Sequence, residues 1–169
     1  MKKSEKIMLE KIVSGAQTGA DRGGLDAALA KGVPIGGWIP KGRKAEDGIV
    51  PEKYVGLVEM TSSSYKKRTE QNVIDSDATL ILTLNVEGAI TGGTKKTAEF
   101  ARMYGKPCVF VVVSPEVVNP LHLGMALRFL VENRVRVLNV AGPRESKQPG
   151  VQEAARAFME AVIDAVRPR

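Results

Sequence analysis

Cysteine, histidine and long apolar runs are all scarce in this chain of 169 residues. The single cysteine, Cys108, excludes a disulfide framework and a cysteine-rich zinc site. The single histidine, His122, excludes a metal centre with two imidazole ligands and argues against a Ser-His-Asp hydrolase. The longest apolar run, Val109–Val113, is far shorter than the ~20 residues that span a bilayer. These absences predict a protein with no membrane span and no metal held by its own side chains.

Aromatic residues make up only 5% of the chain, and its basic residues are scattered in short groups. Both features disfavour a nucleic-acid binder, which needs stacking platforms and a continuous basic surface. The net charge of +6 fits a smaller anionic partner, such as a phosphate-bearing molecule. Residues 1–11 lack the apolar segment of a secretion signal, so we expect a cytoplasmic protein. As a small α/β domain it is also expected to form a homo-oligomer.

Short β-branched segments alternate with segments of helical periodicity along the chain. Strands are predicted at residues 11–14, 35–39, 78–84, 107–113 and 135–140, and helices at 25–32, 69–74, 94–104, 123–130 and 151–162. Residues 40–51 and 142–150 are polar loops. Such alternation is typical of βαβ units and a mostly parallel sheet flanked by helices. We therefore predict an α/β fold: a single Rossmann-like, doubly wound domain over residues 11–169, preceded by an N-terminal extension over residues 1–10.

In a doubly wound sheet, ligands bind beyond the carboxyl ends of the strands, so the loops that follow strands are candidate sites. The first such loop opens a helix with glycines, as anion sites at helix N-termini do. It lacks the spacing of a dinucleotide fingerprint or a Walker loop, and a tight turn that requires glycine is the alternative. The polar side chains in the turn favour a ligand. The candidates are Gly15, Ala16, Gln17, Thr18, Gly19, Asp21 and Arg22.

A second glycine-rich loop follows the strand predicted over residues 78–84. Gly92 and Gly93 open a helix there, and the hydroxyls of Thr94 and Thr97 stand one turn apart. Thr94 alone could be no more than an N-cap residue. Two glycine-rich strand-to-helix loops in one small domain favour an anion cradle.

Two further loops and one helix add candidates. These are Lys41, Arg43 and Asp47 in the loop over residues 40–51, Asn139, Gly142 and Arg144 after the last strand, and Arg68 on the helix before residues 78–84. Asn139 can hydrogen-bond the edge of a heterocycle, and Arg144 can pair with phosphate. The loop over residues 40–51 either reaches over the ligand or is a solvated surface loop. Arg68 either faces the site or belongs to a solvated run of charges.

Together these segments resemble the molybdenum carrier protein family, a branch of the Rossmann-like SLOG superfamily. That superfamily also includes the LOG phosphoribohydrolases and the DNA-processing protein DprA. The resemblance extends over residues 12–158. It is carried by the motifs Ser14–Asp26, Pro40–Gly48, Tyr65–Asn72, Thr91–Thr94 and Asn139–Ser146.

The resemblance implies a binding or carrier protein for a phosphate-bearing, nucleotide-like or pterin ligand at the two glycine loops. In the carrier family the proposed cargo is molybdenum cofactor (molybdopterin), a pterin with a terminal phosphate and a dithiolene-bound oxo-metal. Helix N-termini suit the phosphate, Asn or Asp suits the pterin edge, and Arg and Lys suit an oxyanion. The sequence has no visible ligand set for the metal, so the metal would arrive with its cofactor.

The LOG enzymes supply an alternative function, cleavage of the N-glycosidic bond of a nucleoside monophosphate. By that resemblance Arg68 and Glu99 would be catalytic, with Thr97 near the family's threonine. The chain departs from the LOG pattern, because Thr69 follows Arg68, Thr91 replaces a proline and the third glycine is missing. A structural protein without a ligand is a third possibility, which requires the polar loops to point away from one another.

Overall fold

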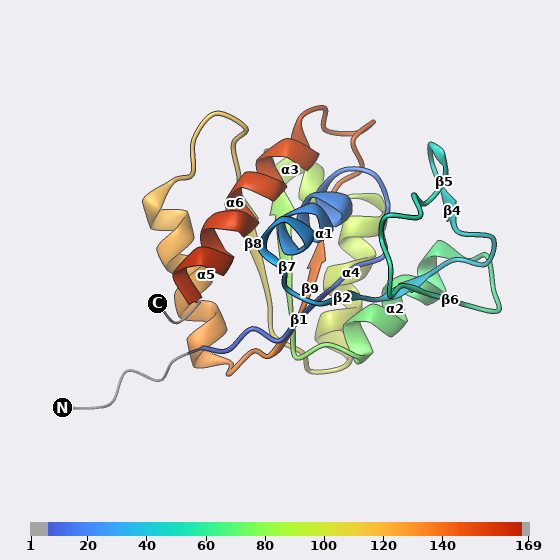
Figure 1. Ribbon diagram of the computed structural model, residues 1–169, viewed down its shortest axis with the longest axis horizontal. Helices are drawn as coiled ribbons and strands as arrows, with labels where there is room; N and C mark the ends of the chain where they lie inside the picture. The colour runs from blue at the N-terminus through green and yellow to red at the C-terminus, as the bar shows by residue number, and fades with distance from the viewer. Residues whose placement is uncertain (1–6, 167–169) are drawn as a thin grey trace.

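The computed structural model describes residues 7–166, and its centre is a five-stranded sheet in which neighbouring strands are parallel (Figure 1). The strand order is β2-β1-β9-β7-β8. The strands are β1 (Lys11–Val13), β2 (Ile35–Gly36), β7 (Ala78–Thr83), β8 (Cys108–Val112) and β9 (Val137–Ala141). The predicted α/β fold with a parallel sheet is therefore confirmed.

Helices cover both faces of this sheet (Figure 1). They are α1 (Ala20–Lys31), α2 (Tyr65–Ile74), the short α3 (Val86–Ala89), α4 (Gly92–Met103), α5 (Pro120–Glu132) and α6 (Val151–Val166). On one face α1 packs against α6 and α6 against α5, while α2 packs against α4 on the other. The buried stripe of α6, which includes Phe158 and Val162, faces the buried strand β7.

The last strand of the chain, β9, lies in the middle of the sheet. It pairs with β1 on one side, where Val13 is opposite Asn139, and with β7 on the other, where Thr79 is opposite Asn139. All three strands are parallel, so their carboxyl ends meet at one edge of the sheet. The loops that follow β1, β7 and β9 are brought together at that edge.

The strand predicted over residues 35–39 is wrong in one respect, because it is split at Gly37. This glycine has φ +124, a backbone conformation that side chains rarely adopt, and an added Cβ would lie 2.2 Å from the carbonyl oxygen of Ser14. Residues after it leave the main sheet and form β3 (Trp38–Ile39), which pairs with β6 (Val58–Glu59). The chain therefore starts a second, smaller lobe at this point.

That lobe contains a short antiparallel hairpin of β4 (Lys44–Ala45) and β5 (Gly48–Ile49), within the segment predicted as a loop. Its small apolar core is built around Ile39, Val50 and Tyr54. The hydroxyl of Tyr54 donates a 2.7 Å hydrogen bond to Asp26 of α1. This bond helps to hold the lobe against the main domain.

Several predicted boundaries shift in the structure. Helix α2 begins at Tyr65 rather than at residue 69, because Ser64 caps it by accepting a bond from the Lys67 amide at 3.3 Å. In the N-terminal extension predicted over residues 1–10, residues 1–6 lie outside the described residues, and Ile7 packs against the main core. Within residues 7–166, no helix has the length and apolar character that crossing a membrane requires.

Candidate functional site

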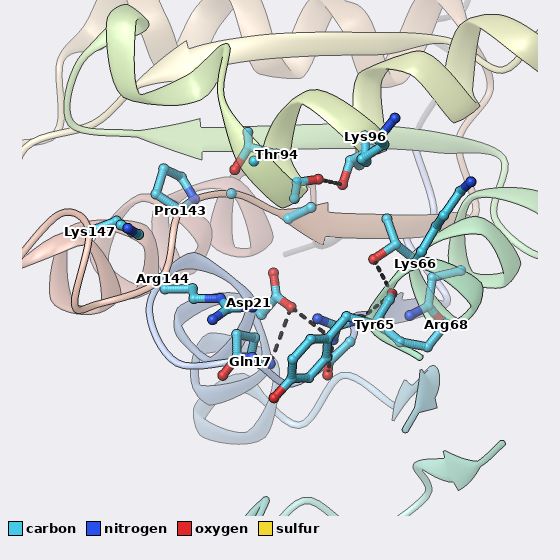
Figure 2. A pocket seen from close by; sticks show the side chains of 18 of the residues that line it. Gln17, Asp21, Tyr65, Lys66, Arg68, Thr94, Lys96, Pro143, Arg144 and Lys147 are labelled. Carbon is cyan, nitrogen blue, oxygen red and sulfur yellow. Dashed lines mark hydrogen bonds and ion pairs between the residues drawn. The ribbon is translucent and has the colours of Figure 1, made fainter. Parts of the chain in front are cut away.

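A cavity of about 530 Å³ opens at the edge of the sheet where the loops meet (Figure 2). Its walls come from the loop after β1, from α2, from the start of α4 and from the end of β9. In Figure 2, Gln17, Asp21 and Arg144 lie across the cavity from Thr94 of α4. The lining residues that the sequence predicted are Gly15, Gln17, Asp21, Arg68, Gly92, Gly93, Thr94, Thr97, Asn139, Gly142 and Arg144.

Arg68 lies in the wall of this cavity and is only 6% exposed, so it does not belong to a solvated run of charges. Its guanidinium donates hydrogen bonds to the carbonyl oxygens of Gly15 and Tyr65. A Cβ added at Gly15 would lie 1.8 Å from the Arg68 Nη1. A larger residue at this position would therefore displace the Arg68 guanidinium from its place in the wall.

Asp21 stands beside Arg68, with its Oδ2 at 3.6 Å from the Arg68 Nη1. The same oxygen accepts a 3.2 Å hydrogen bond from the backbone amide of Gln17. Burial raises the pKa of Asp21 to about 6, although the positive charge of Arg68 and the Gln17 hydrogen bond lower it. The site therefore holds a carboxyl group that changes its charge close to neutral pH.

Helix α4 presents its N-terminus to the cavity. Gly92 and Gly93 are exposed and line the cavity, so the first amide groups of α4 are accessible there. Because α4 begins at Gly92, Thr94 is not its N-cap residue and lies inside the first turn, 6% exposed. The Thr97 hydroxyl donates a 3.0 Å bond to the Gly93 carbonyl oxygen. A helix N-terminus of this kind attracts an anion through its free amides and its dipole.

The start of α1 differs, because the protein itself occupies its amide groups. The amides of residues 17 to 20 donate in turn to the side chains of Asp21, Gln17 and Gln152 and to the carbonyl oxygen of Pro143, over 3.1–3.3 Å. The Gln17 Oε1 accepts from both Thr18 and Glu46, and its Nε2 has no partner within residues 7–166. The two glycine loops are thus unequal, and the loop before α4 is the more open one.

The end of β9 and the start of α2 complete the walls. The Asn139 Nδ2 donates a 3.2 Å bond to the Thr79 hydroxyl, which fixes this amide at the cavity floor. The ring of Tyr65 is flanked by three cations, with the guanidinium carbons of Arg144 and Arg68 at 5.0 and 5.5 Å from its centroid and the Lys44 Nζ at 4.7 Å. Tyr65 therefore positions two of the arginines of the site by cation–π contacts.

The charge of the cavity is strongly one-sided. Its cationic lining residues are Lys66, Arg68, Lys96, Arg144 and Lys147, and among the described residues that line it Asp21 is the only acid. Lys66 and Lys147 are exposed at the rim, and the structure gives neither side chain an ion pair within residues 7–166. Such a cavity favours an anionic ligand.

Seven predicted residues do not line the cavity: Ala16, Thr18, Gly19, Arg22, Lys41, Arg43 and Asp47. The Arg22 guanidinium donates two hydrogen bonds to the Asp47 carboxylate, at 2.6 and 2.8 Å, and so joins α1 to the hairpin. Arg43 donates to the carbonyl oxygens of Val50 and Pro51, inside its own loop. These contacts hold the small lobe in place.

Glu99, the acid that the hydrolase alternative requires, also lies outside the cavity lining. It is exposed on α4 and pairs with Lys96 at 3.1 Å and with Lys95 at 3.9 Å. The hydrogen bond from Lys96 lowers the pKa of Glu99. A carboxylate held at the surface in this way does not meet the requirement for an acid beside the ligand.

Sequence reasoning missed several lining residues, chiefly Tyr65, Lys66, Asn72 and Lys147. Placing the start of α2 at residue 69 leaves Tyr65 and Lys66 outside the helix and hides their position. Asn72 has a structural role as well, because its amide exchanges two hydrogen bonds with the backbone of Trp38, at 2.7 and 3.0 Å. The only available signal for Tyr65, Lys66 and Asn72 was their place in the motif Tyr65–Asn72, and Lys147 directly follows the motif Asn139–Ser146.

Within residues 7–166, no group of three or more histidine, cysteine, aspartate or glutamate residues could hold a metal. Comparisons with known proteins identify the family of the chain. The crystal structure of the Putative molybdenum carrier protein from Syntrophus aciditrophicus SB at 1.45 Å resolution is 42% identical to the chain, with a TM-score of 0.82. The match covers 94% of this chain and 98% of that one. No functionally curated protein matches the chain. The model of the circularly permutated YpsA SLOG family matches residues 12–163, and the chain belongs to that family.

Proposed function

We propose that this protein binds and carries a phosphate-bearing, nucleotide-like or pterin ligand in the cavity at the sheet edge. The observation that carries the proposal is the charge of the lining, with five cationic side chains against the single acid Asp21 among the described residues. The accessible amides of Gly92 and Gly93 add a second source of positive potential. Both features favour an anion over a neutral metabolite.

The chemistry of the walls suggests how such a ligand is oriented. A terminal phosphate fits the N-terminus of α4, where the amides of Gly92 and Gly93 are accessible. The floor carries hydrogen-bonding groups, Asn139 and Asp21, which suit the polar edge of a heterocycle. The opposite end, near Arg144 and Lys147, suits a further oxyanion.

We propose molybdenum cofactor as the cargo. It combines a pterin edge, a terminal phosphate and an oxo-metal, and the three parts of the cavity offer partners for each. The name of the protein from Syntrophus aciditrophicus supports the same class of cargo. The described residues contain no cluster of metal ligands, so the metal would be held by its own cofactor.

Native mass spectrometry of protein purified gently from cells, combined with metal analysis, tests the cargo. Release of a pterin together with molybdenum is the expected result. Release of a nucleoside monophosphate would keep the ligand site and overturn the choice of cargo. Protein that carries nothing and takes up neither class of ligand in a thermal-shift screen would overturn the proposed function.

Two pairs of neighbouring lysines test the place of binding. Lys66 and Lys96 line the cavity, whereas Lys67 and Lys95, one residue away on the same helices, do not. Titration with inorganic phosphate should show several-fold weaker binding for Lys66→Ala and Lys96→Ala. Lys67→Ala and Lys95→Ala remove the same charge outside the cavity and should leave the affinity close to that of the wild type. Equal losses in all four variants would mean that phosphate is attracted by net charge alone.

A further inference from the structure

The carboxylate of Glu46, on the turn between β4 and β5, is held by donors from two loops at the sheet edge. Its Oε2 accepts from the Ser146 hydroxyl at 2.6 Å and lies 3.9 Å from the Arg144 Nη1. Its Oε1 accepts from the Thr18 hydroxyl and from the Ser146 amide, the latter at 3.3 Å. Two hydroxyls, one amide and one guanidinium therefore converge on a single negatively charged group.

This set of donors is what a protein uses to bind a phosphate or another oxyanion. Thr18 follows β1, and Arg144 and Ser146 follow β9, so the donors stand at the carboxyl ends of two neighbouring strands. Arg144 also lines the cavity, which makes the two places adjacent. Burial by itself would raise the pKa of Glu46, but the hydrogen bonds from Ser146 and Thr18 outweigh it and lower the pKa.

The Glu46 side chain can leave this position without moving the hairpin. The Glu46 amide donates to the Gln17 Oε1 at 2.9 Å, and the next residue, Asp47, is held by Arg22 through two bonds of 2.6 and 2.8 Å. The backbone is thus anchored on both sides of Glu46. Rotation of the side chain toward solvent would expose the four donors while these two anchors stay in place.

We propose that Glu46 occupies a second anion subsite and that a second anionic group of the ligand displaces it. This inference rests on the proposed function, because it adds a second contact to a ligand already held at α4. It also narrows the ligand class to molecules with two anionic groups, such as a diphosphate or a phosphate ester that also carries an oxo-metal anion. A ligand with a single anionic group leaves Glu46 in place.

Calorimetric titration of the full chain with inorganic phosphate, diphosphate and triphosphate tests the proposal, with Glu46→Gln as the variant. Glutamine has nearly the same shape but does not compete as an anion. We expect at least one of the two longer probes to bind about tenfold more tightly to Glu46→Gln than to the wild type. In Glu46→Gln, inorganic phosphate should bind the first site with unchanged affinity, and a second phosphate should bind to each chain. The matched control is Glu52→Gln, at an exposed glutamate of the same lobe, and it should not change the affinity for any of the three probes.

Ser146→Ala in the Glu46→Gln background supplies the second test. Ser146 is exposed and donates its hydroxyl only to Glu46 within residues 7–166, so the chain should fold normally without it. The gain in affinity for the longer probe should be lost. Any of three results would overturn the subsite. Ser146→Ala could leave the gain in affinity unchanged, Glu46→Gln could show no gain, or all three probes could gain affinity equally with unchanged stoichiometry. If phosphate binds normally in these cases, the proposed function stands; if no probe binds either chain, both proposals fail.

Discussion

Replacing Asp21 by asparagine should make stability less sensitive to pH. The pKa of this carboxyl is 3.8 in a model peptide and about 6 in the folded protein, where burial opposes its charge. The proton therefore stabilises the folded state fully below about pH 4, and this contribution is lost as the pH rises through about 6. The difference between the two values corresponds to roughly 3 kcal/mol above pH 7. Asparagine keeps the shape of the protonated group and cannot ionise.

Urea denaturation of the wild type and of Asp21→Asn between pH 4 and pH 8 measures this effect. The two chains should be about equally stable at pH 4, and the variant should gain up to about 3 kcal/mol over the wild type by pH 8. Arg68 keeps its hydrogen bonds to the carbonyl oxygens of Gly15 and Tyr65 in the variant. Asp164→Asn, at an exposed ion pair with Lys31, is the control and should change the free energy of unfolding by less than about 1 kcal/mol. A constant difference between wild type and Asp21→Asn would refute the reasoning.

Three further outcomes follow from the site. Gly93→Ala should raise the free energy of unfolding by up to about 1 kcal/mol, because the added Cβ meets nothing within 4 Å, and it should weaken phosphate binding. The control Gly124→Ala, at an equally open position on α5, should raise the free energy of unfolding without affecting phosphate binding. Asp47→Asn should cost about 2 kcal/mol in thermal or urea unfolding, because it leaves the buried Arg22 without its charged partner, and should not change phosphate affinity. Incubation of the protein with nucleoside monophosphates should release no free base. If base is released and the release persists in Glu99→Gln, Glu99 is not the catalytic residue.

The main sheet and the longer helices could be predicted from the sequence because these elements have local signals, whereas the short strands β4, β5 and β6 could not. The buried run of β7 and the helical spacing of Val151, Phe158 and Val162 in α6 depend on neighbouring residues alone. The break at Gly37 could not be predicted, because the reason for it is a contact with Ser14, which lies far away in the sequence. The place of β9 in the middle of the sheet is likewise a result of pairing between distant segments.

The candidate site was predictable to the extent that strand ends determine it. The positions of Gly92, Gly93 and Asn139 at the cavity follow from the rule that ligands bind at the carboxyl ends of parallel strands. That rule does not say which loop amides remain accessible, and the loop before α1 turned out to be occupied by side chains of the protein itself. Nor does it distinguish Arg68, which is buried in the wall, from its exposed neighbour Lys67.

The central position of β9 also has a consequence for how the chain acquires its shape during synthesis. β1 starts at residue 11, but the neighbour that joins it to β7 starts at residue 137, so the ribosome makes it long after β1 and also after β7. Until then, the two halves of the sheet have no strand to connect them, and their exposed edges are open to wrong pairing. Closure over so long a stretch of chain is entropically costly, so the insertion of β9 is expected to be a slow and late step. The cavity at the sheet edge, whose lining includes Asn139 and Ala141 of β9, is therefore complete only after this strand has been inserted.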